Sequence, residues 1–322
     1  MSAVAELLQP LAPWLADTHV SEIMINRPGE IWIEYEGHLQ AFSLPVLTRV
    51  YLLRLFQLIA NENHQVISRQ RPLLSGNLPD GSRVQLCLPP VSQHPVCAIR
   101  RQTVQHFQLA DYAAQGFYQQ NVACSETHTV PTEDLLHTYY VQEDWPAFIQ
   151  TAIRLRKNIV ISGGTSSGKT TFLNACLYEM EPQDRLLVLE DAREVKVPHD
   201  NHVCLLASKV DQGEAQVDMQ MLVQCCLRLR PDRILMGEMR GAEIMYFVHA
   251  CSTGHEGALA SVHANTPKMA FMRMVQMYKL NAVPTMTDQD ILSLLEAVID
   301  VILQVVKTPR GRRLHSVYYR GV

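Results

Sequence analysis

The chain has 322 residues, of which 47% are apolar and 19% are charged, and its formal net charge is −4. This composition is typical of a folded globular protein with room for two domains, and it excludes a disordered or fibrous chain. The small negative charge excludes a general attraction to nucleic acid or anionic lipid, so any such binding needs a local basic patch.

The chain starts with MSAVAELLQPLAPW, which lacks the cationic segment of a signal peptide and carries Glu6 before any apolar run could reach membrane length. A later apolar segment, at 294–306, is interrupted by charges and is shorter than the roughly 20 residues of a spanning helix. Eight cysteines show neither a CxxC pair nor zinc-ligand spacing, which favours reduced, buried thiols. We therefore expect a cytoplasmic protein without a membrane anchor.

The first hundred residues carry the patterns of a small α+β domain. EIMIN and EIWIEYEG alternate apolar and polar side chains around the turn Pro28-Gly29, which predicts a hairpin. A helix should follow, because Leu52, Leu55 and Ile59 fall on one stripe. The predicted strands and helix lie at residues 22–26, 30–37, 46–63 (the helix), 83–90 and 96–100.

Residues 103–144 are polar and rich in glutamine, without sustained periodicity. We interpret them as a linker, with room for one short helix, between an N-terminal domain at 1–102 and a C-terminal domain at 145–322. At about 3.3 Å per extended residue, this linker is long enough to pass from one subunit to a neighbouring subunit.

From residue 145 onward, strand patterns alternate with helical patterns. The apolar runs NIVIS, RLLVLED, RILMGE, GALASVH and DVILQVV are separated by helical stretches such as TFLNACLYEM and QMLVQCCLRL. This alternation is typical of a mainly parallel sheet that is covered by helices.

The stretch SGGTSSGKTT, at 162–171, fits the phosphate-binding pattern GxxxxGK[ST] and lies between a strand and a helix, as that loop requires. Its backbone N–H groups and the helix N-terminus favour bound phosphate, Lys169 should reach the β and γ phosphates, and the Thr170 hydroxyl should bind Mg²⁺. The residues expected to bind ATP are Gly163, Gly164, Thr165, Ser166, Ser167, Gly168, Lys169, Thr170 and Thr171. The predicted fold class is therefore α/β, a RecA-like P-loop domain preceded by a smaller α+β domain.

Hydrolysis also needs acidic groups near the metal and the attacking water. The strand RILMGEMRG ends in Glu238 where an aspartate is usual, and Glu238 is our first candidate for general base, water positioner and Mg²⁺ ligand, directly or through water. The stretch LEDAREV adds Glu190, Asp191 and Glu194 at the end of another strand, where open α/β sheets bind their ligands.

Two histidines flank the short strand GALASV, namely His255 and His263. His255 does not continue into an HExxH motif, so a zinc peptidase is not supported. His263 follows a strand of the same sheet, where its imidazole could contact the γ-phosphate; a purely structural role is the alternative for both histidines.

Four motifs occur in a fixed order: GGTSSGKTT, LEDAREV, LRLRPDRILMGEMRGAE and TGHEGALASVHANTP. Together they resemble the Walker A, Asp, atypical Walker B and His boxes of the secretion ATPase superfamily of type II and type IV secretion. In the N-terminal half, VSEIMINRPGEIWIE, GNLPDGSRVQLCLPP and AIRR resemble the traffic ATPases of type IV secretion and conjugation systems. The chain departs from the family at Gly254-His255-Glu256-Gly257, where Gly-His-Pro-Gly is common, and at Ser261, where threonine is common.

The resemblance implies a cytoplasmic homo-hexamer that docks on inner-membrane components of the apparatus, with nucleotide between the two domains. It also implies arginines that reach the phosphates from the N-terminal domain; by motif position these are Arg83 and Arg100, with Arg101 as the substitute. The implied function is a motor whose ATP hydrolysis moves the domains and drives pilus assembly or the transfer of DNA or protein. The long linker adds the hypothesis that N-terminal domains are exchanged between subunits.

Two other functions stay open. A DNA-translocating motor is disfavoured, because apart from Arg154, Arg156, Lys157 and PRGRR (309–313) the basic residues are scattered, and no aromatic platform accompanies them. Direct nucleic-acid binding is therefore expected to be weak or absent. A nucleotide-gated scaffold with little turnover is the other alternative, since Glu238 is atypical. The Met-rich stretch at 269–280 is expected to pack in the core or a subunit interface rather than on a membrane.

Overall fold

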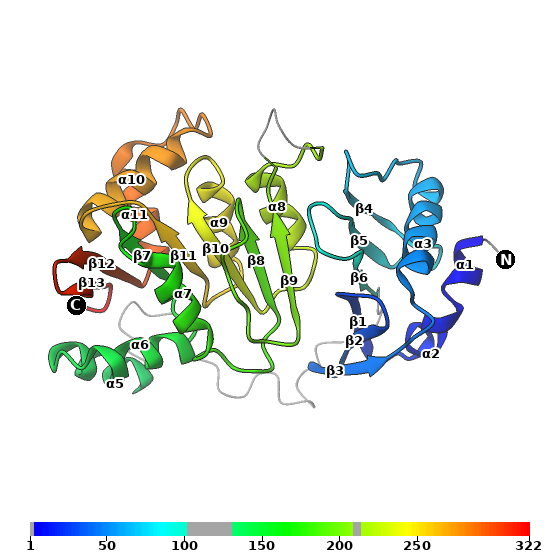
Figure 1. Cartoon of the computed structure of the whole chain (residues 1–322), viewed down its shortest axis with the longest axis horizontal. Coiled ribbons are helices and arrows are strands. Elements are labelled where there is room, and N and C mark those ends of the chain that lie inside the picture. Colours follow the sequence, from blue (N-terminus) through cyan, green and yellow to red (C-terminus); the bar gives the residue numbers. More distant parts are fainter. Residues whose placement is uncertain (1–2, 102–130, 209–213) are drawn as a thin grey trace, which may run out of the picture.

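The computed structural model describes residues 3–101, 131–208 and 214–322, which build two β-sheets that lie next to each other (Figure 1). The N-terminal sheet is antiparallel, with strand order β3-β2-β1-β6-β5-β4. Its strands are β1 (Val20–Ile25), β2 (Glu30–Tyr35), β3 (His38–Ser43), β4 (Leu73–Asn77), β5 (Arg83–Cys87) and β6 (Val96–Arg100). The predicted hairpin is present as β1 and β2, in which Ile23 pairs with Ile33.

Four helical segments accompany the N-terminal sheet: α1 (Ala3–Leu7), η1 (Gln9–Leu11), α2 (Ala12–Ala16) and α3 (Arg49–Glu62). The α3 helix begins after Thr48, whose hydroxyl accepts a hydrogen bond from the Tyr51 backbone N–H at 3.2 Å, as an N-cap residue does. Its apolar stripe, which includes Leu52, Leu55 and Ile59, is buried against the sheet, so the predicted helix is confirmed.

The C-terminal sheet has strand order β13-β12-β7-β11-β10-β8-β9 and is parallel except for its last hairpin, β12–β13. Its strands are β7 (Ile159–Gly163), β8 (Leu186–Glu190), β9 (His202–Leu206), β10 (Arg233–Met239), β11 (Leu259–Val262), β12 (Val301–Thr308) and β13 (Gly311–Tyr319). Its helices are α5 (Pro131–Val141), α6 (Trp145–Arg154), α7 (Lys169–Leu177), α8 (Met219–Cys226), α9 (Ile244–Ser252), α10 (Pro267–Lys279) and α11 (Asp288–Val298). The predicted α/β class, with a smaller α+β part before it, is confirmed.

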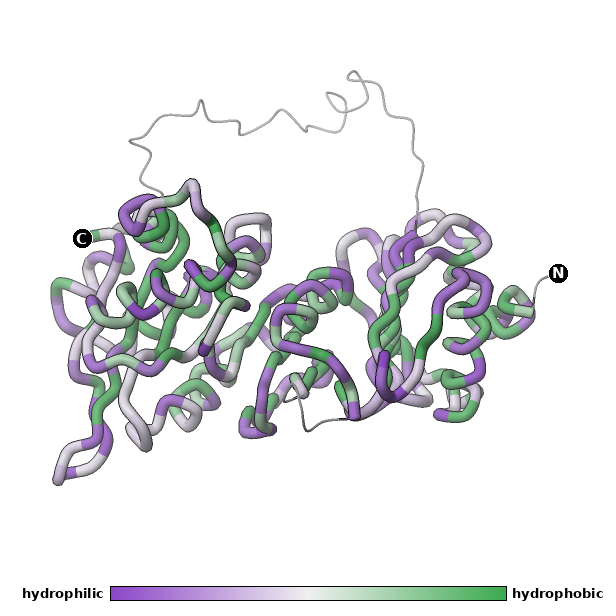
Figure 2. Tube along the Cα trace, turned by 90° about the horizontal axis from the view of Figure 1, so that it is seen from above, coloured by the Kyte–Doolittle hydropathy of each residue, from purple (hydrophilic) through white to green (hydrophobic). Residues whose placement is uncertain are grey.

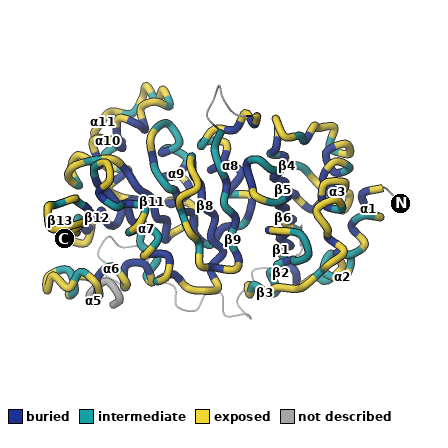
Figure 3. Tube along the Cα trace, viewed as in Figure 1, coloured by how far each residue is buried: buried dark blue, intermediate teal, exposed yellow. Residues whose placement is uncertain are grey.

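Helices cover both faces of the C-terminal sheet. Buried side chains of α6 and α7 pack on one face, and those of α8, α9, α10 and α11 pack on the other. The strands between them are buried on both sides, as the continuous apolar runs predict (Figure 3). Along the Cα trace, hydrophobic stretches run mainly through the interior and hydrophilic stretches mainly over the outside (Figure 2).

Part of the predicted linker is helical. Residues 131–141 form α5, which packs on α6 through Tyr140, whose ring lies 5.6 Å from Trp145 and 5.7 Å from Phe148. The segment 103–130, on which the reach of the linker depends, lies outside the described residues, as does Cys124. The domain limits at 102 and 145 stay a prediction. In the described chain no helix is both long and apolar enough to cross a bilayer.

The two sheets share an apolar interface. Met24, Val91 and Ala98 from the N-terminal sheet and its loops belong to the same buried cluster as residues of α8 and β9. The Cys87 and Cys225 thiols meet across this interface, and their contact and burial raise the pKa of Cys225. The Leu206 N–H of the edge strand β9 donates a hydrogen bond to the Val91 carbonyl oxygen at 2.8 Å. The N-terminal half therefore covers the free edge of the C-terminal sheet.

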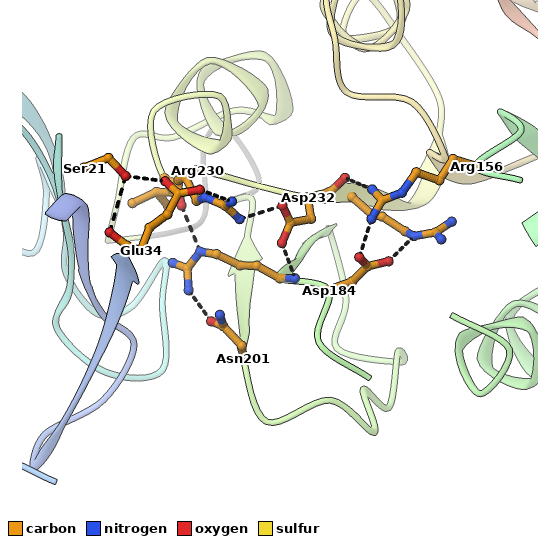
Figure 4. A network of polar contacts seen from close by, with 10 residues as sticks. Ser21, Glu34, Arg156, Asp184, Asn201, Arg230 and Asp232 are labelled. Carbon is orange, nitrogen blue, oxygen red and sulfur yellow. Dashed lines mark hydrogen bonds and ion pairs between the residues drawn. The ribbon is translucent and has the colours of Figure 1, made fainter. Parts of the chain in front are cut away.

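A chain of polar contacts crosses the same interface (Figure 4). Glu34 of β2 pairs with Arg230 at 2.5 Å, and Arg230 pairs with Asp232 at 2.5 Å. The other carboxylate oxygen of Asp232 accepts the Arg185 backbone N–H at 2.8 Å. The buried Arg185 guanidinium donates to Asn26 of the N-terminal half at 2.6 Å and to Asn201 at 2.5 Å. Removing one partner would leave a buried charge uncompensated, so this network fixes how the halves meet.

Glu22→Gln is expected to stabilise the protein above pH 7 and to have little effect near pH 5. Burial raises the pKa of Glu22 from 4.5 to about 7. The stability that its neutral form contributes is full below the unfolded pKa and is lost as pH rises through 7, where a buried carboxylate must ionise. Glutamine cannot ionise. The thermal unfolding midpoint of the variant should therefore equal that of wild type at about pH 5 and exceed it at about pH 8. Glu62→Gln, on the exposed side of α3, is the control; an effect independent of pH would contradict this prediction.

Candidate functional site

The predicted phosphate loop follows β7 at the carboxyl edge of the C-terminal sheet and leads into α7. Gly168, the N-cap of α7, has φ 95°, and Ser166 has φ 59°, so the loop uses left-handed backbone at two positions. A Cβ added to Gly163 would lie 2.6 Å from the Val305 carbonyl oxygen of β12, so only glycine fits there. The Ser167 hydroxyl is buried without a hydrogen-bond partner among the described residues, which fits a loop that binds an anion.

Lys169 begins α7 and is buried. Its ammonium donates to the Gly163 and Gly164 carbonyl oxygens at 3.0 and 3.3 Å, and it lies 3.3 Å from His263 Nε2. Burial lowers the pKa of Lys169, and the nearby Glu238 carboxylate opposes that shift. The structure thus holds the lysine charge inside the loop, where it can meet a phosphate.

Glu238 and His263 lie at the ends of β10 and β11 and are in polar contact, with Glu238 Oε1 3.0 Å from His263 Nε2. The other Glu238 oxygen accepts from the Arg240 guanidinium at 2.7 Å, and Arg240 also pairs with Asp191. Burial lowers the pKa of His263, which favours a neutral imidazole. These groups join Lys169 to the predicted acids in one continuous polar cluster.

The acids after β8 differ in their surroundings. Glu190 is buried, which raises its pKa, and its Oε1 accepts the backbone N–H groups of Glu194 and Val195 at 2.8 and 2.7 Å. Glu190 therefore holds the loop that presents Glu194. The Glu194 carboxylate accepts the Thr170 hydroxyl at 3.0 Å. Two oxygen ligands thus meet beside the phosphate loop, and this is the chemistry that Mg²⁺ prefers.

The remaining loop residues border open space. Gly164, Thr165 and His263 line a cavity of about 500 Å³ together with residues of α10. Thr171 is exposed on the first turn of α7. His255, the other histidine that flanks β11, is half-buried, and burial lowers its pKa; it forms no contact with the cluster among the described residues.

The structure does not bring the predicted arginines to this cluster. Arg83 and Arg100 pair across β5 and β6, in the sheet on the far side of β9 from α7 (Figure 1). Arg100 is exposed and lies 3.7 Å from Glu22, whereas Arg101 donates to the Val20 carbonyl oxygen at 3.1 Å. Within the described part of the chain, none of the three has a hydrogen bond or ion pair with the phosphate loop.

Arg240 also belongs to the cluster, although it was not predicted from the sequence. It joins Glu238 to Asp191, and its backbone N–H and that of Gly241 donate to Glu243 at 2.6 and 2.8 Å. The signal was present, because Arg240 stands two residues after Glu238 in the same motif. A carboxylate that ends a buried strand needs a nearby cation, and alternate residues of a strand share one face.

A family model described as type II/IV secretion system protein matches residues 5–310. The chain is similar to type IV secretion system protein VirB11 of Brucella suis biovar 1, with 35% identity over 321 residues that cover 97% of this chain and 89% of that protein. It is also similar to probable conjugal transfer protein TrbB of Sinorhizobium fredii, with 34% identity over 307 residues, covering 94% and 84%.

A solved structure shares the whole architecture. It is the crystal structure of the VirB11 ATPase from the Brucella suis type IV secretion system in complex with sulphate. The likeness has a TM-score of 0.92 and 32% sequence identity, and it covers 100% of both chains.

Proposed function

This chain belongs to the type II/IV secretion system protein family and is an ATPase, and from that premise we propose that it powers substrate transfer or pilus assembly in a type IV secretion system. The observation that supports its chemistry is the convergence of Lys169, Glu238 and His263 at the carboxyl edge of one sheet. Parallel α/β sheets bind their ligands at this edge.

The proposed reaction is attack of water on the γ-phosphorus, which forms one P–O bond and breaks the bond to the β-phosphate oxygen of ADP. Glu238 orients the water and takes its proton. Lys169 offsets the charge on the phosphates, and the neutral His263 contacts the γ-phosphate and registers its loss. Arg240 holds the Glu238 carboxylate in place through their 2.7 Å contact.

Thr170 and Glu194, with Glu238 directly or through water, are the residues that would hold Mg²⁺. Their contact at 3.0 Å between hydroxyl and carboxylate supports this assignment. The ion would offset charge on the phosphate oxygens. Glu190 serves this group by fixing the loop that carries Glu194.

The assembly we propose is a homo-hexamer docked on inner-membrane components of the secretion apparatus, on the cytoplasmic side. Arg83 and Arg100 lie far from the phosphate loop of their own chain, which supports completion of the site by a neighbouring subunit. In a ring, the N-terminal half of one subunit would place them at the phosphate loop of the next subunit. Hydrolysis would then move one domain against the other.

Lys169→Gln in the native host tests the proposed function. The variant should lose plasmid transfer or surface pilus, because glutamine cannot offset phosphate charge, and the two phenotypes are scored separately. Lys268→Gln, at an exposed position of α10, is the matched control. A Lys169→Gln strain with normal transfer and normal pilus would contradict the assignment to secretion.

A further inference from the structure

The β12–β13 hairpin lies against the phosphate loop on the side opposite the catalytic cluster. In the sheet, β7 lies between β11, which leads to His263, and β12. Gly163 pairs with Val305 of β12, and β12 continues three residues further before the turn at Thr308 and Gly311. The hairpin therefore extends past the carboxyl edge of β7, and its return strand carries side chains over the loop.

Arg312 is the residue that this geometry brings to the loop. A Cβ built on Gly168 would lie 2.5 Å from Arg312 Cδ and 3.0 Å from its Nε, so the side chain lies directly over the N-cap of α7. Arg312 is exposed, and its guanidinium forms no hydrogen bond or ion pair with the described residues. A free guanidinium thus lies beside N–H groups that are arranged to bind phosphate.

Its neighbours in PRGRR have other roles. The Arg313 guanidinium donates to the Arg310 and Arg312 carbonyl oxygens at 3.2 and 3.1 Å and so closes the turn. The Arg310 backbone N–H donates to the Thr308 hydroxyl at 3.2 Å. Of this basic stretch, Arg312 alone is the arginine whose side chain covers Gly168.

The direction of the bound nucleotide follows from the proposed function, on which this inference rests. Glu238 and His263 require the γ-phosphate on the β11 side of the loop. The rest of the nucleotide must then extend toward β12 and the hairpin. We propose that Arg312 is a nucleotide-positioning residue whose guanidinium binds the α-phosphate and ribose half of the nucleotide, the half that ATP and ADP share.

Arg312→Ala in the full-length protein tests this role by titration with ATP, ADP and inorganic tripolyphosphate. The dissociation constants for ATP and ADP should both rise, by about tenfold, which is the usual effect of losing a charge-assisted hydrogen bond. Tripolyphosphate keeps a phosphate at the α position but lacks the ribose, so its affinity should also fall, by less than the affinities for ATP and ADP. Arg312→Lys should recover part of the loss, and Arg312→Gln, which keeps the aliphatic contact with Gly168, should not.

Arg310→Ala is the matched control on the same hairpin, and thermal unfolding without nucleotide reports whether each variant is folded. Wild-type affinity of Arg312→Ala for ADP would overturn this inference and leave the proposed ATPase intact. An equal loss of affinity for ADP and for tripolyphosphate in Arg312→Ala would also overturn it. If Arg310→Ala and Arg312→Ala both weaken single-stranded DNA binding at low salt with ADP affinity unchanged, the turn is a nucleic-acid surface and the inference is wrong. Failure of wild type to bind either nucleotide would refute the proposed function itself.

Discussion

Glu238→Gln is expected to reduce steady-state ATP hydrolysis by about 10²–10⁴-fold, the usual contribution of a general base. Glutamine keeps the shape of the side chain and can still accept from Arg240, but it cannot take a proton from water. ATP affinity should stay close to that of wild type, because Lys169 and the phosphate loop are unchanged. Turnover, measured by phosphate release, should therefore fall, while ATP affinity, measured with a fluorescent nucleotide, should stay the same.

Glu256→Gln, at an exposed site in the loop between α9 and β11, is the matched control and should keep full activity. Glu194→Gln distinguishes the role of Glu194 from that of Glu238. Loss of a metal ligand should raise the Mg²⁺ concentration needed for half-maximal turnover. Unchanged turnover in Glu238→Gln would refute its catalytic role and would favour the nucleotide-gated scaffold or another base.

Arg100→Ala is expected to reduce hydrolysis by about 10³–10⁵-fold if Arg100 acts as an arginine finger on the phosphates. Arg100 is exposed and lies across the sheet interface from its own phosphate loop, so its partner site should belong to a neighbouring subunit. Mixing Arg100→Ala with Glu238→Gln should then restore activity. In the mixed ring some sites combine an intact Glu238 from one subunit with an intact Arg100 from its neighbour.

The mixing experiment requires that the Arg100→Ala and Glu238→Gln proteins are each inactive alone. It also requires that subunits exchange between rings after mixing. Arg54→Ala, an exposed arginine on α3, controls for loss of surface charge. Mixed rings that stay inactive would contradict completion of the site by a second subunit. An active Arg100→Ala parent would remove Arg100 from the site, and the same pair of measurements would then be made with Arg83→Ala.

The sequence predicted those features that depend on local pattern. The phosphate loop was identified because its glycines, lysine and threonine have a fixed spacing between a strand and a helix. The helix α3 was identified by an apolar stripe of period 3.6, and Glu238 by its place at the end of an apolar strand.

The structure was needed for contacts between segments that are distant in the chain. Strand β3 was not predicted, because nearly all of its residues are exposed and show no alternation. Arg185 looks like any strand-end arginine in the sequence, yet it is buried between Asn26 and Asn201. Arg312 lies 144 positions after Gly168, and only the pairing of β12 with β7 brings the two together.

The edge of β9 limits how the two halves can separate. The Leu206 N–H has its partner in Val91, so lifting the N-terminal half away would expose an unpaired strand edge together with the apolar cluster around Met24. Bare strand edges recruit other strands and lead to aggregation. A chain cut between its halves should therefore yield a catalytic fragment that self-associates through β9. We therefore expect the N-terminal half of the working protein to rotate about the β9 edge and not to detach from it.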